Sequence, residues 1–276
     1  MIADRFIFIV IDTCKRLLLS PELIDIIVDY AHDDFDTLLN YSLASRLFLP
    51  SSRFHLFEWL DLKSSQWAEF FDLLDSPLST ITHIQSINLD FEGKMPDLLS
   101  IVTRLHGFGL HSITLDNMRI EQPINLDWEI IELVGLRKLS IERGNFSDPS
   151  HTFDIISRFK NVEHLCLHFC IFHGLADTSA DIPHHPIRNS TVPFWKIFEL
   201  HVWDKNCYYE TFSWLTVQPD ISALETVVLT GFSPEDFVVV GNFLRVLGPQ
   251  LKYLELQLTS TVLGMSCFLH FCIPQR

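Results

Sequence analysis

The chain has 276 residues, 47% of them hydrophobic and 12% aromatic, so it holds enough apolar material for a continuous core and is not a disordered polymer. Its 35 acidic and 20 basic residues give a net charge of −15. This balance argues against a nonspecific nucleic-acid binder, because such binding depends on Lys and Arg contacts with phosphates. It favours a basic partner, although solubility alone also accounts for it.

Residues 1–18 are predicted to form an N-terminal extension. They contain an unbroken apolar run at residues 6–11, flanked by Asp4 and Asp12. The run is shorter than the roughly 18 residues that a membrane span needs, and its flanks are too acidic for a signal peptide. We therefore expect a short element that packs beside the next domain, and no membrane contact.

Three short helices are predicted next. The first begins at Ser20, a favoured N-cap residue, with Pro21 and Glu22 in the first turn. The second is expected over residues 36–46 and the third over residues 50–57. Helices this short enclose little core, so the unit needs a neighbour or a partner.

A motif runs through these three helices. Its first part is Leu19-Ser20-Pro21-Glu22-Leu23-Ile24 with Ile27, and its later parts are Leu38-Leu39, Ser42-Leu43-Ala44-Ser45-Arg46 and Pro50-Ser51-Ser52-Arg53-Phe54-His55-Leu56-Phe57.

Over residues 19–62 this motif resembles an F-box, in the form that fungi place ahead of divergent leucine-rich repeats. F-boxes bind the Skp adaptor of SCF-type ubiquitin ligases, which connects them to a cullin, and the domain behind them captures the substrate. By matching positions, the resemblance places adaptor contact at Leu19, Pro21, Leu23, Ile24, Ile27, Leu43 and Arg46.

The motif departs from the family at three places. The family's proline stands one place later here, at Pro21, its valine-cysteine pair is Ala44-Ser45, and its tryptophan is Phe48. The last two changes remove apolar volume that packs or touches the adaptor, so they favour weakened or lost adaptor binding. The same apolar residues also suit a purely structural role, since a small helical unit uses one stripe for both purposes.

After a connecting helix predicted over residues 63–83, a loose Leu-x-x-Leu-x-Leu signature recurs with gaps of 26, 26, 26, 35, 27 and 27 residues. Within each copy apolar and polar residues alternate, which predicts a short strand with one polar face. A period of this size indicates repeated units that bury their apolar sides by stacking. The copies start at Ile84, Leu110, Leu136, Val162, Ile197, Leu224 and Leu251.

Segments with helical spacing lie between the strands, at residues 98–105, 128–134, 155–159 and 237–247. Strand-helix-strand units of this kind resemble leucine-rich repeats of the long, helix-containing type. The fold class expected is therefore α/β: a small three-helix F-box-like unit, followed over residues 84–276 by a right-handed solenoid with parallel strands inside and helices outside. The 35-residue gap marks an insertion near residues 174–193. Of the positions where the family has Asn or Cys, only Cys170 fits, and an ordinary α/β domain remains the alternative.

The polar residues between the registered leucines are expected on the concave face as a substrate surface. One column is acidic, with Asp90, Asp116 and Glu142, and suits a basic segment, although a solvated face is the plainer interpretation. An aromatic and titratable centre is the second feature, and its Trp and Tyr suit an interface unless the insertion covers them. Its residues are His164, Glu199, His201, Trp203 and Tyr253, and His168 is also expected on this substrate surface.

No metal, cofactor or catalytic activity is predicted. His164, Cys166, His168 and Cys170 alternate along one strand, but same-face residues lie about 6.6 Å apart, too far for all four to reach one zinc ion. The chain has no phosphate loop, dinucleotide-binding motif or nucleophile elbow. Its six cysteines are not clustered, which favours an intracellular, cytoplasmic or nuclear, protein.

The last residues are apolar, so either residues 268–273 fold back as a cap or the array is a truncated one. The leading hypothesis is a substrate receptor of an SCF-type ligase with an unknown substrate. The alternatives are a noncatalytic repeat scaffold without ligase coupling, and a secreted repeat receptor. Glycosylation sequons at Asn40, Asn145 and Asn189 favour the last.

Overall fold

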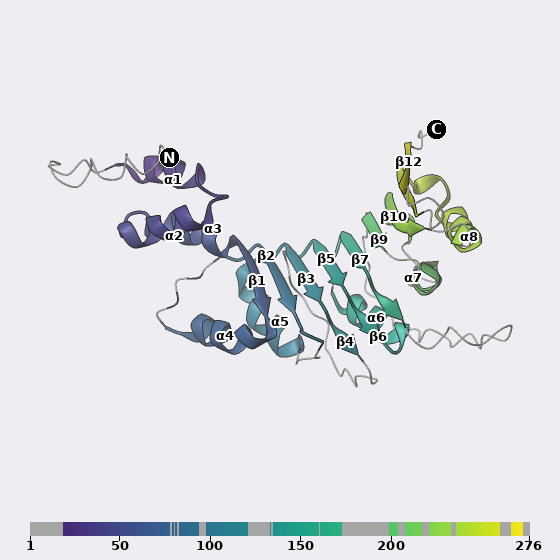
Figure 1. The fold of residues 1–276 in the computed structure, drawn as a ribbon, viewed down its shortest axis with the longest axis horizontal. Coiled ribbons are helices and arrows are strands. Elements are labelled where there is room, and N and C mark those ends of the chain that lie inside the picture. The colour runs from purple at the N-terminus through teal and green to yellow at the C-terminus, as the bar shows by residue number, and fades with distance from the viewer. Residues whose placement is uncertain are drawn as a thin grey trace. The chain divides into compact units, whose positions relative to one another are not determined.

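The chain divides into two compact units, Met1–Glu58 and Trp59–Arg276, each described by itself (Figure 1). The predicted extension at residues 1–18 and the insertion at residues 174–193 lie outside the described residues. The computed structural model describes residues 19–77, 79, 81, 83–93, 98–120, 133, 135–159, 161–172, 199–203, 208–216, 221–232, 236–259 and 266–272.

The described part of the first unit forms helices α1 (Pro21–Asp29), α2 (Phe35–Ala44) and α3 (Leu49–Glu58), as predicted. Pro21 occupies the first turn of α1, and the side chain of Asp34 caps α2 by accepting a hydrogen bond from the Thr37 backbone N–H at 3.0 Å. The core of the unit is small. It contains the buried residues Ile24, Val28 and Leu38, against which Tyr41, Phe48 and Leu56 pack.

Residues 59–62, which the sequence analysis assigns to the helical unit, begin a strand instead. Trp59–Lys63 forms β1 and pairs in parallel with Ser86–Asp90 of the second unit. The repeat signature was present here too, because Phe57, Leu60 and Leu62 have its spacing. Its first residue, Phe57, lies in α3, so the helical pattern and the repeat pattern overlap there.

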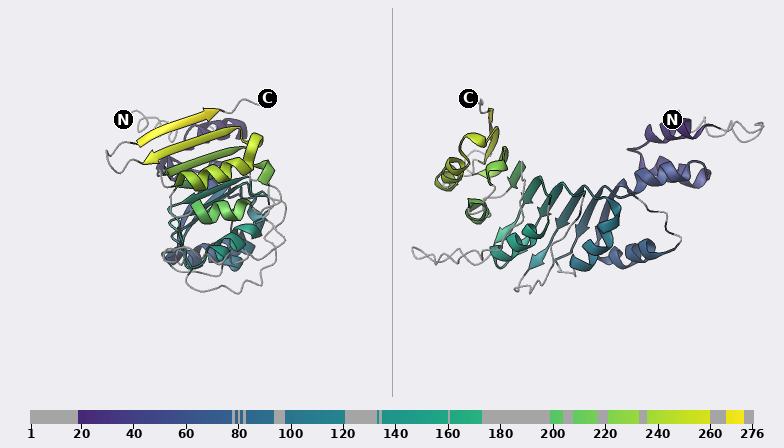
Figure 2. Two further views of the ribbon diagram at one scale, coloured as in Figure 1. Left: turned by 90° about the vertical axis from the view of Figure 1, so that its right-hand side faces the viewer. Right: turned by 180° about the vertical axis from the view of Figure 1, so that it is seen from behind.

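The second unit is of the α/β class, with a mostly parallel sheet and helices, as predicted (Figures 1 and 2). In the described residues its main sheet has nine strands, in the order β1-β2-β3-β5-β7-β9-β10-β11-β12. All seven predicted strands are present. Their bounds are β2 Ser86–Asp90, β3 Ser112–Asp116, β5 Lys138–Glu142, β7 His164–His168, β9 Glu199–Trp203, β10 Thr226–Phe232 and β11 Tyr253–Thr259.

The register of the sheet follows the repeat. Ile87 lies opposite Leu60 on one side and Ile113 on the other, and Leu89 stands in the same relation to Leu62 and Leu115. Leu60 is half-buried and the other five of these apolar side chains are buried, and the helices of the unit lie along the same side of the sheet (Figure 2). The intervening polar residues are therefore held on the opposite side.

The helices of the second unit follow the predicted apolar spacing, with two exceptions. The helix expected at residues 128–134 lies outside the described residues apart from Leu133, and α7 was not predicted although Tyr208, Phe212 and Leu215 have helical spacing. No helix in the described part of the chain is long and apolar enough to cross a membrane. The α-helices are α4 Trp67–Asp75, α5 Leu98–Leu105, α6 Pro149–Arg158, α7 Tyr208–Thr216 and α8 Phe237–Leu247, with 3₁₀ turns at Ser64–Gln66, His106–Phe108, Ile221–Ala223 and Gly248–Gln250.

A sharp turn follows three of the strands. Asn117, Arg143 and Phe169 come directly after β3, β5 and β7 and have φ values of 52°, 51° and 52°. Asn tolerates this left-handed conformation, whereas for Arg and Phe it costs roughly 1 to 2 kcal/mol each. The turns lead into a second sheet of two-residue strands, β4 (Arg119–Ile120), β6 (Asn145–Phe146) and β8 (Ile171–Phe172), which pair in parallel.

The C-terminal apolar segment folds back, one of the two outcomes that the sequence leaves open. Ser266–Cys272 forms β12 and pairs antiparallel with β11 over its full length. The edge of β11 is therefore covered by a hairpin partner and not by another parallel strand.

Replacing Phe243 with Ala will test the packing of the helical layer. The Phe243 ring stacks on the Phe212 ring at 4.1 Å between centroids, and both side chains are buried. We expect the free energy of unfolding in urea to fall by about 3 to 5 kcal/mol. The control Val238→Ala changes an exposed residue of the same helix and should cost at most about 0.5 kcal/mol. Equal effects from the two variants would contradict this packing.

Candidate functional site

The polar side of the nine-stranded sheet, here called the row face, carries three rows of residues that follow the predicted register. The acidic residues Asp90, Asp116 and Glu142 are neighbours in one row, as expected. The first row is Ser86, Ser112, Lys138, His164, Glu199, Thr226 and Tyr253; the second is Asn88, Thr114, Ser140, Cys166, His201, Val228 and Glu255; the third is Asp90, Asp116, Glu142, His168, Trp203, Thr230 and Gln257.

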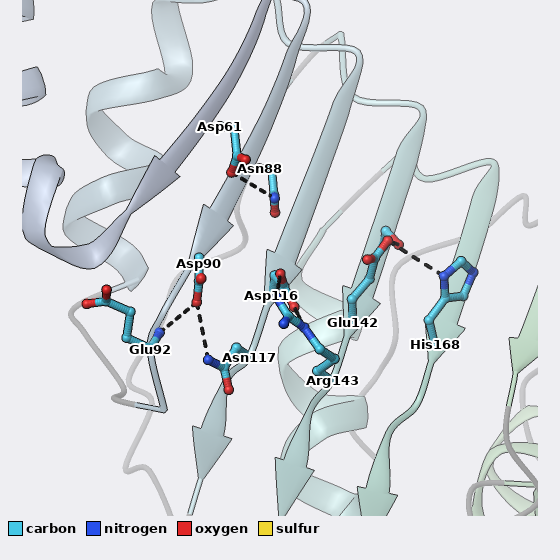
Figure 3. Close-up of polar contacts among 10 residues, drawn as sticks. Asp61, Asn88, Asp90, Glu92, Asp116, Asn117, Glu142, Arg143 and His168 are labelled. Atoms are coloured by element: carbon cyan, nitrogen blue, oxygen red, sulfur yellow. Dashed lines mark hydrogen bonds and ion pairs between the residues drawn. The ribbon is translucent and has the colours of Figure 1, made fainter.

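Asp90 is held in place by neutral donors. Its Oδ1 accepts hydrogen bonds from the backbone N–H of Glu92 at 2.8 Å and from Nδ2 of Asn117 at 3.3 Å (Figure 3). In the second row Nδ2 of Asn88 donates to Oδ1 of Asp61 on β1 at 3.0 Å. These contacts orient both carboxylates and bring no cation to them.

Asp116 differs from the expectation for the acidic column, because it is buried and paired with a cation. The Nε of Arg143 donates to Oδ1 of Asp116 at 2.7 Å, and Nη2 of Arg143 donates to Oδ2. The guanidinium is therefore hydrogen-bonded to both carboxylate oxygens (Figure 3). The hydrogen bonds that Arg143 donates to Asp116 raise the pKa of Arg143, and the charges of Asp116, Asp90 and Glu142 add to the effect. The centre of the column is thus neutralised from within the protein.

Glu142 completes the column with partners on both sides. The hydroxyl of Ser140 donates to its Oε1 at 3.1 Å, and Nδ1 of His168 lies 3.6 Å from the same oxygen (Figure 3). Burial lowers the pKa of His168, partly opposed by the charge of Glu142, and the charges of His201 and Lys138 lower it further. His168 is therefore held largely neutral at physiological pH.

The predicted titratable centre comes together in part. Glu199 on β9 lies between two histidines: its Oε2 is 2.6 Å from Nδ1 of His164, and its Oε1 bonds to Nε2 of His201. Burial alone raises the pKa of Glu199, but the hydrogen bonds from His201 and His164 and their charges outweigh it, so the net shift is downward. The carboxylate in turn fixes both imidazoles, with the bonded nitrogen of each as the donor.

Two members of the predicted centre are not joined to it. Tyr253 lies on β11, two strands from Glu199, and its hydroxyl donates to Oε2 of Glu255 at 2.8 Å. Trp203 occupies the third row beside His168, but its side chain is not among those described. The expected interface centre therefore reduces to His164, Glu199 and His201.

The cysteines near this centre have different environments. Cys166 lies in the second row between Ser140 and His201, and burial raises the pKa of its thiol to about 11. Cys170 follows the left-handed turn at Phe169, so it leaves the row face, and its thiol donates to the backbone oxygen of Ile141 at 3.5 Å. In the described part of the chain no group of three or more His, Cys, Asp or Glu is arranged to hold a metal ion.

The first unit offers an apolar surface. His55 of α3 binds Asp29 of α1 at 2.8 Å through Nε2, which holds α1 by its polar side. Six of the seven residues expected to contact the adaptor are exposed. They are Leu19, Pro21, Leu23, Ile27, Leu43 and Arg46, here called the α1–α2 surface.

Ile24 is the exception and corrects the prediction. It is only 3% exposed and packs with Val28 and Leu38 in the core of the unit. It lies one residue past Leu23 on the helix, and this rotation of about 100° turns it inward while Leu23 faces out. Ile24 therefore stabilises the unit and does not belong to its surface.

Several partners on the row face were missed by the sequence analysis. Arg143 and Asn117 each stand 27 positions after the carboxylate they bind, Asp116 and Asp90, so each immediately follows the third-row member of the next strand. The repeat spacing therefore contained enough information to predict these two pairs. At the next such position Phe169 has no donor, and Glu142 is bonded by Ser140 instead.

Comparison of the sequence with protein-family models gives no match, and a search of the curated proteins gives none either. By its fold the chain is an α/β protein with a mostly parallel sheet and a helical unit.

Replacing Arg143 with Met will test the neutralisation of Asp116. The variant leaves a buried carboxylate without its cation, and we expect the free energy of unfolding at pH 7 to fall by about 1 to 3 kcal/mol. The loss is modest because Arg143 is more than half exposed, so solvent screens the pair. Adding Asp116→Asn should recover part of the loss. Additive effects of the two substitutions in urea unfolding would contradict a direct pair.

The pH dependence of stability will test the environment of His168. The pKa of a histidine in the unfolded chain is near 6.5, and in the folded protein that of His168 is lower. As the pH falls through 6.5 the unfolded state takes up the proton first, so the folded state loses stability until the pH reaches the folded pKa. We expect His168→Gln to lose less stability than the unmodified chain between about pH 7 and pH 5. Parallel pH profiles would contradict the assignment.

Proposed function

We propose that the protein is a noncatalytic substrate-recognition subunit of an SCF-type ubiquitin ligase. In this proposal the helical unit binds the Skp adaptor, and through it a cullin, while the second unit is a leucine-rich-repeat solenoid whose row face holds the substrate protein. Ubiquitin transfer belongs to other subunits.

The α1–α2 surface is the observation that carries the proposal. Leu23 and Ile27 are 49% and 38% exposed on consecutive turns of α1, and Leu43 is 77% exposed at the end of α2. A unit with so small a core does not gain from displaying these side chains to water, whereas a partner helix or groove would bury them. They occupy the positions at which the F-box resemblance expects the adaptor.

The position of Phe48 also supports an adaptor-binding unit. The family's tryptophan is replaced here, but the Phe48 ring stacks on Tyr41 at 5.3 Å and packs against the core of the unit. The substitution therefore keeps an aromatic ring inside the helical unit. Only Ala44 and Ser45, at the end of α2, remain as departures that favour an uncoupled scaffold.

The periodic register supports the repeat assignment of the second unit. Strands 26 or 27 residues apart pair in parallel with identical positions opposite each other, from β1 to β7 and again from β9 to β11. The Cys170 thiol bonds to the Ile141 carbonyl, as expected of a cysteine that satisfies backbone groups at a repeat turn. A face of polar rows on such an array is a surface suited to a protein ligand.

Co-expression of the full chain with a Skp adaptor will test the proposal. We expect a stoichiometric complex that co-elutes on size exclusion. The variant Leu23→Glu/Ile27→Glu should weaken it at least about 100-fold, because burying two such side chains is worth about 3 kcal/mol or more.

The matched control is Val238→Glu/Val246→Glu, which places the same charges on exposed apolar positions of α8 in the second unit. It should bind the adaptor like the unmodified chain. A folded Leu23/Ile27 variant that retains the adaptor would refute the placement of the surface. An unmodified chain that is folded but binds no adaptor would favour a free-standing scaffold.

A further inference from the structure

Strand β12 is the outermost strand of the main sheet at its C-terminal end (Figure 2). It is seven residues long and pairs on one side with β11. Among the described residues no strand pairs with its other side. An edge of this length offers a row of backbone N–H and C=O groups to another strand.

The edge lacks the charges that normally protect such strands. Ser266–Cys272 contains no Lys, Arg, Asp or Glu, whereas β1, the opposite edge of the sheet, carries the exposed residues Asp61 and Lys63. Charged side chains on an edge strand discourage pairing with another chain. Of the two edges, β12 is the one suited to accept a strand.

The apolar layer beneath the sheet continues onto β12 without cover. Leu269 lies opposite Leu256, and Phe271 lies opposite Leu254, and both partners on β11 are buried. Leu269 and Phe271 are nevertheless 41% and 46% exposed. The row of core residues that runs along the sheet therefore ends in two large apolar side chains open to water.

We propose that β12 pairs antiparallel with β12 of a second copy of this chain, so that the two main sheets become one continuous sheet across a twofold axis. This homodimer is independent of adaptor binding. A twofold axis normal to the sheet makes the two edge strands antiparallel, and each copy brings the same uncovered Leu269 and Phe271 to the axis. A lone extended peptide would satisfy the backbone groups but leave most of this apolar layer exposed.

The local charge also permits self-association. The described residues from 221 to 272 contain three carboxylates, Glu225, Asp236 and Glu255, and two cations, Arg245 and Lys252, a net of −1. Lys252 is paired with Glu225 at 2.5 Å. The acidic excess of the chain, −15 in total, therefore lies mostly elsewhere, and two copies can meet at this end with little repulsion.

Sedimentation equilibrium of the full chain across the micromolar range will test the dimer. We expect Leu269→Lys to raise the dimer dissociation constant at least about tenfold, because burying an unpaired ammonium group in an apolar interface costs free energy. The matched control is Ile171→Lys, which alters a residue of β8 with the same 41% exposure and should leave the dimer intact. A monomeric unmodified chain, or a folded Leu269→Lys variant that still dimerises, would overturn the proposal.

If the Leu269→Lys variant does not fold, amide hydrogen exchange on the unmodified chain tests the same pairing. Protection of residues 266–272 should rise with protein concentration, while protection of β1 should not. A dimer whose formation leaves the exchange of β12 unchanged would place the contact elsewhere and refute the pairing.

Discussion

The parallel pairing of short strands spaced 26 or 27 residues apart is the constraint on which the second unit depends. Because each strand alternates apolar and polar residues, the register that aligns Ile87 with Ile113 and Leu89 with Leu115 also turns every polar residue to the other side. A slip of one residue would expose the whole apolar set. Packing of the helices against that set, the position of the left-handed turns and the composition of the row face all follow from this register.

Several charged side chains of the row face are paired with one another, so the face offers fewer free charges than its sequence suggests. Arg143 has a left-handed backbone conformation, and its guanidinium binds the buried Asp116. The same residue therefore has an unfavourable backbone conformation and a favourable ion pair. Glu199 is shared between two histidines. Asp61 and Asp90 are bonded only by neutral donors in the contacts described above, and Glu142 is bonded by Ser140 and lies beside a largely neutral His168, so none of these three carboxylates has a cation among those contacts. A partner would therefore encounter carboxylates on β1, β2 and β5, and imidazoles bonded to Glu199 near β9.

The helical unit and strand β12 present apolar surface for different physical reasons. In the described part of the helical unit the core is small, with Ile24 and Val28 inside it and Leu23 and Ile27 exposed. In the sheet, β12 pairs antiparallel with β11, and among the described residues no helix follows it, so Leu269 and Phe271 continue the apolar layer of the sheet but stay exposed.

The sequence by itself determined the α/β class, the three N-terminal helices, the seven registered strands and the identity of the residues in each polar row, because these depend on local periodicity. Tertiary structure decided what depends on contacts between distant segments. It assigned Trp59–Lys63 to the sheet, turned Ile24 into the core, and paired Asp116 with Arg143. It also joined His164 to Glu199 across a 35-residue gap and separated Tyr253 from them. A one-dimensional pattern shows which face a residue occupies, but a side chain's partner is set by the strand beside it and by the turn that follows.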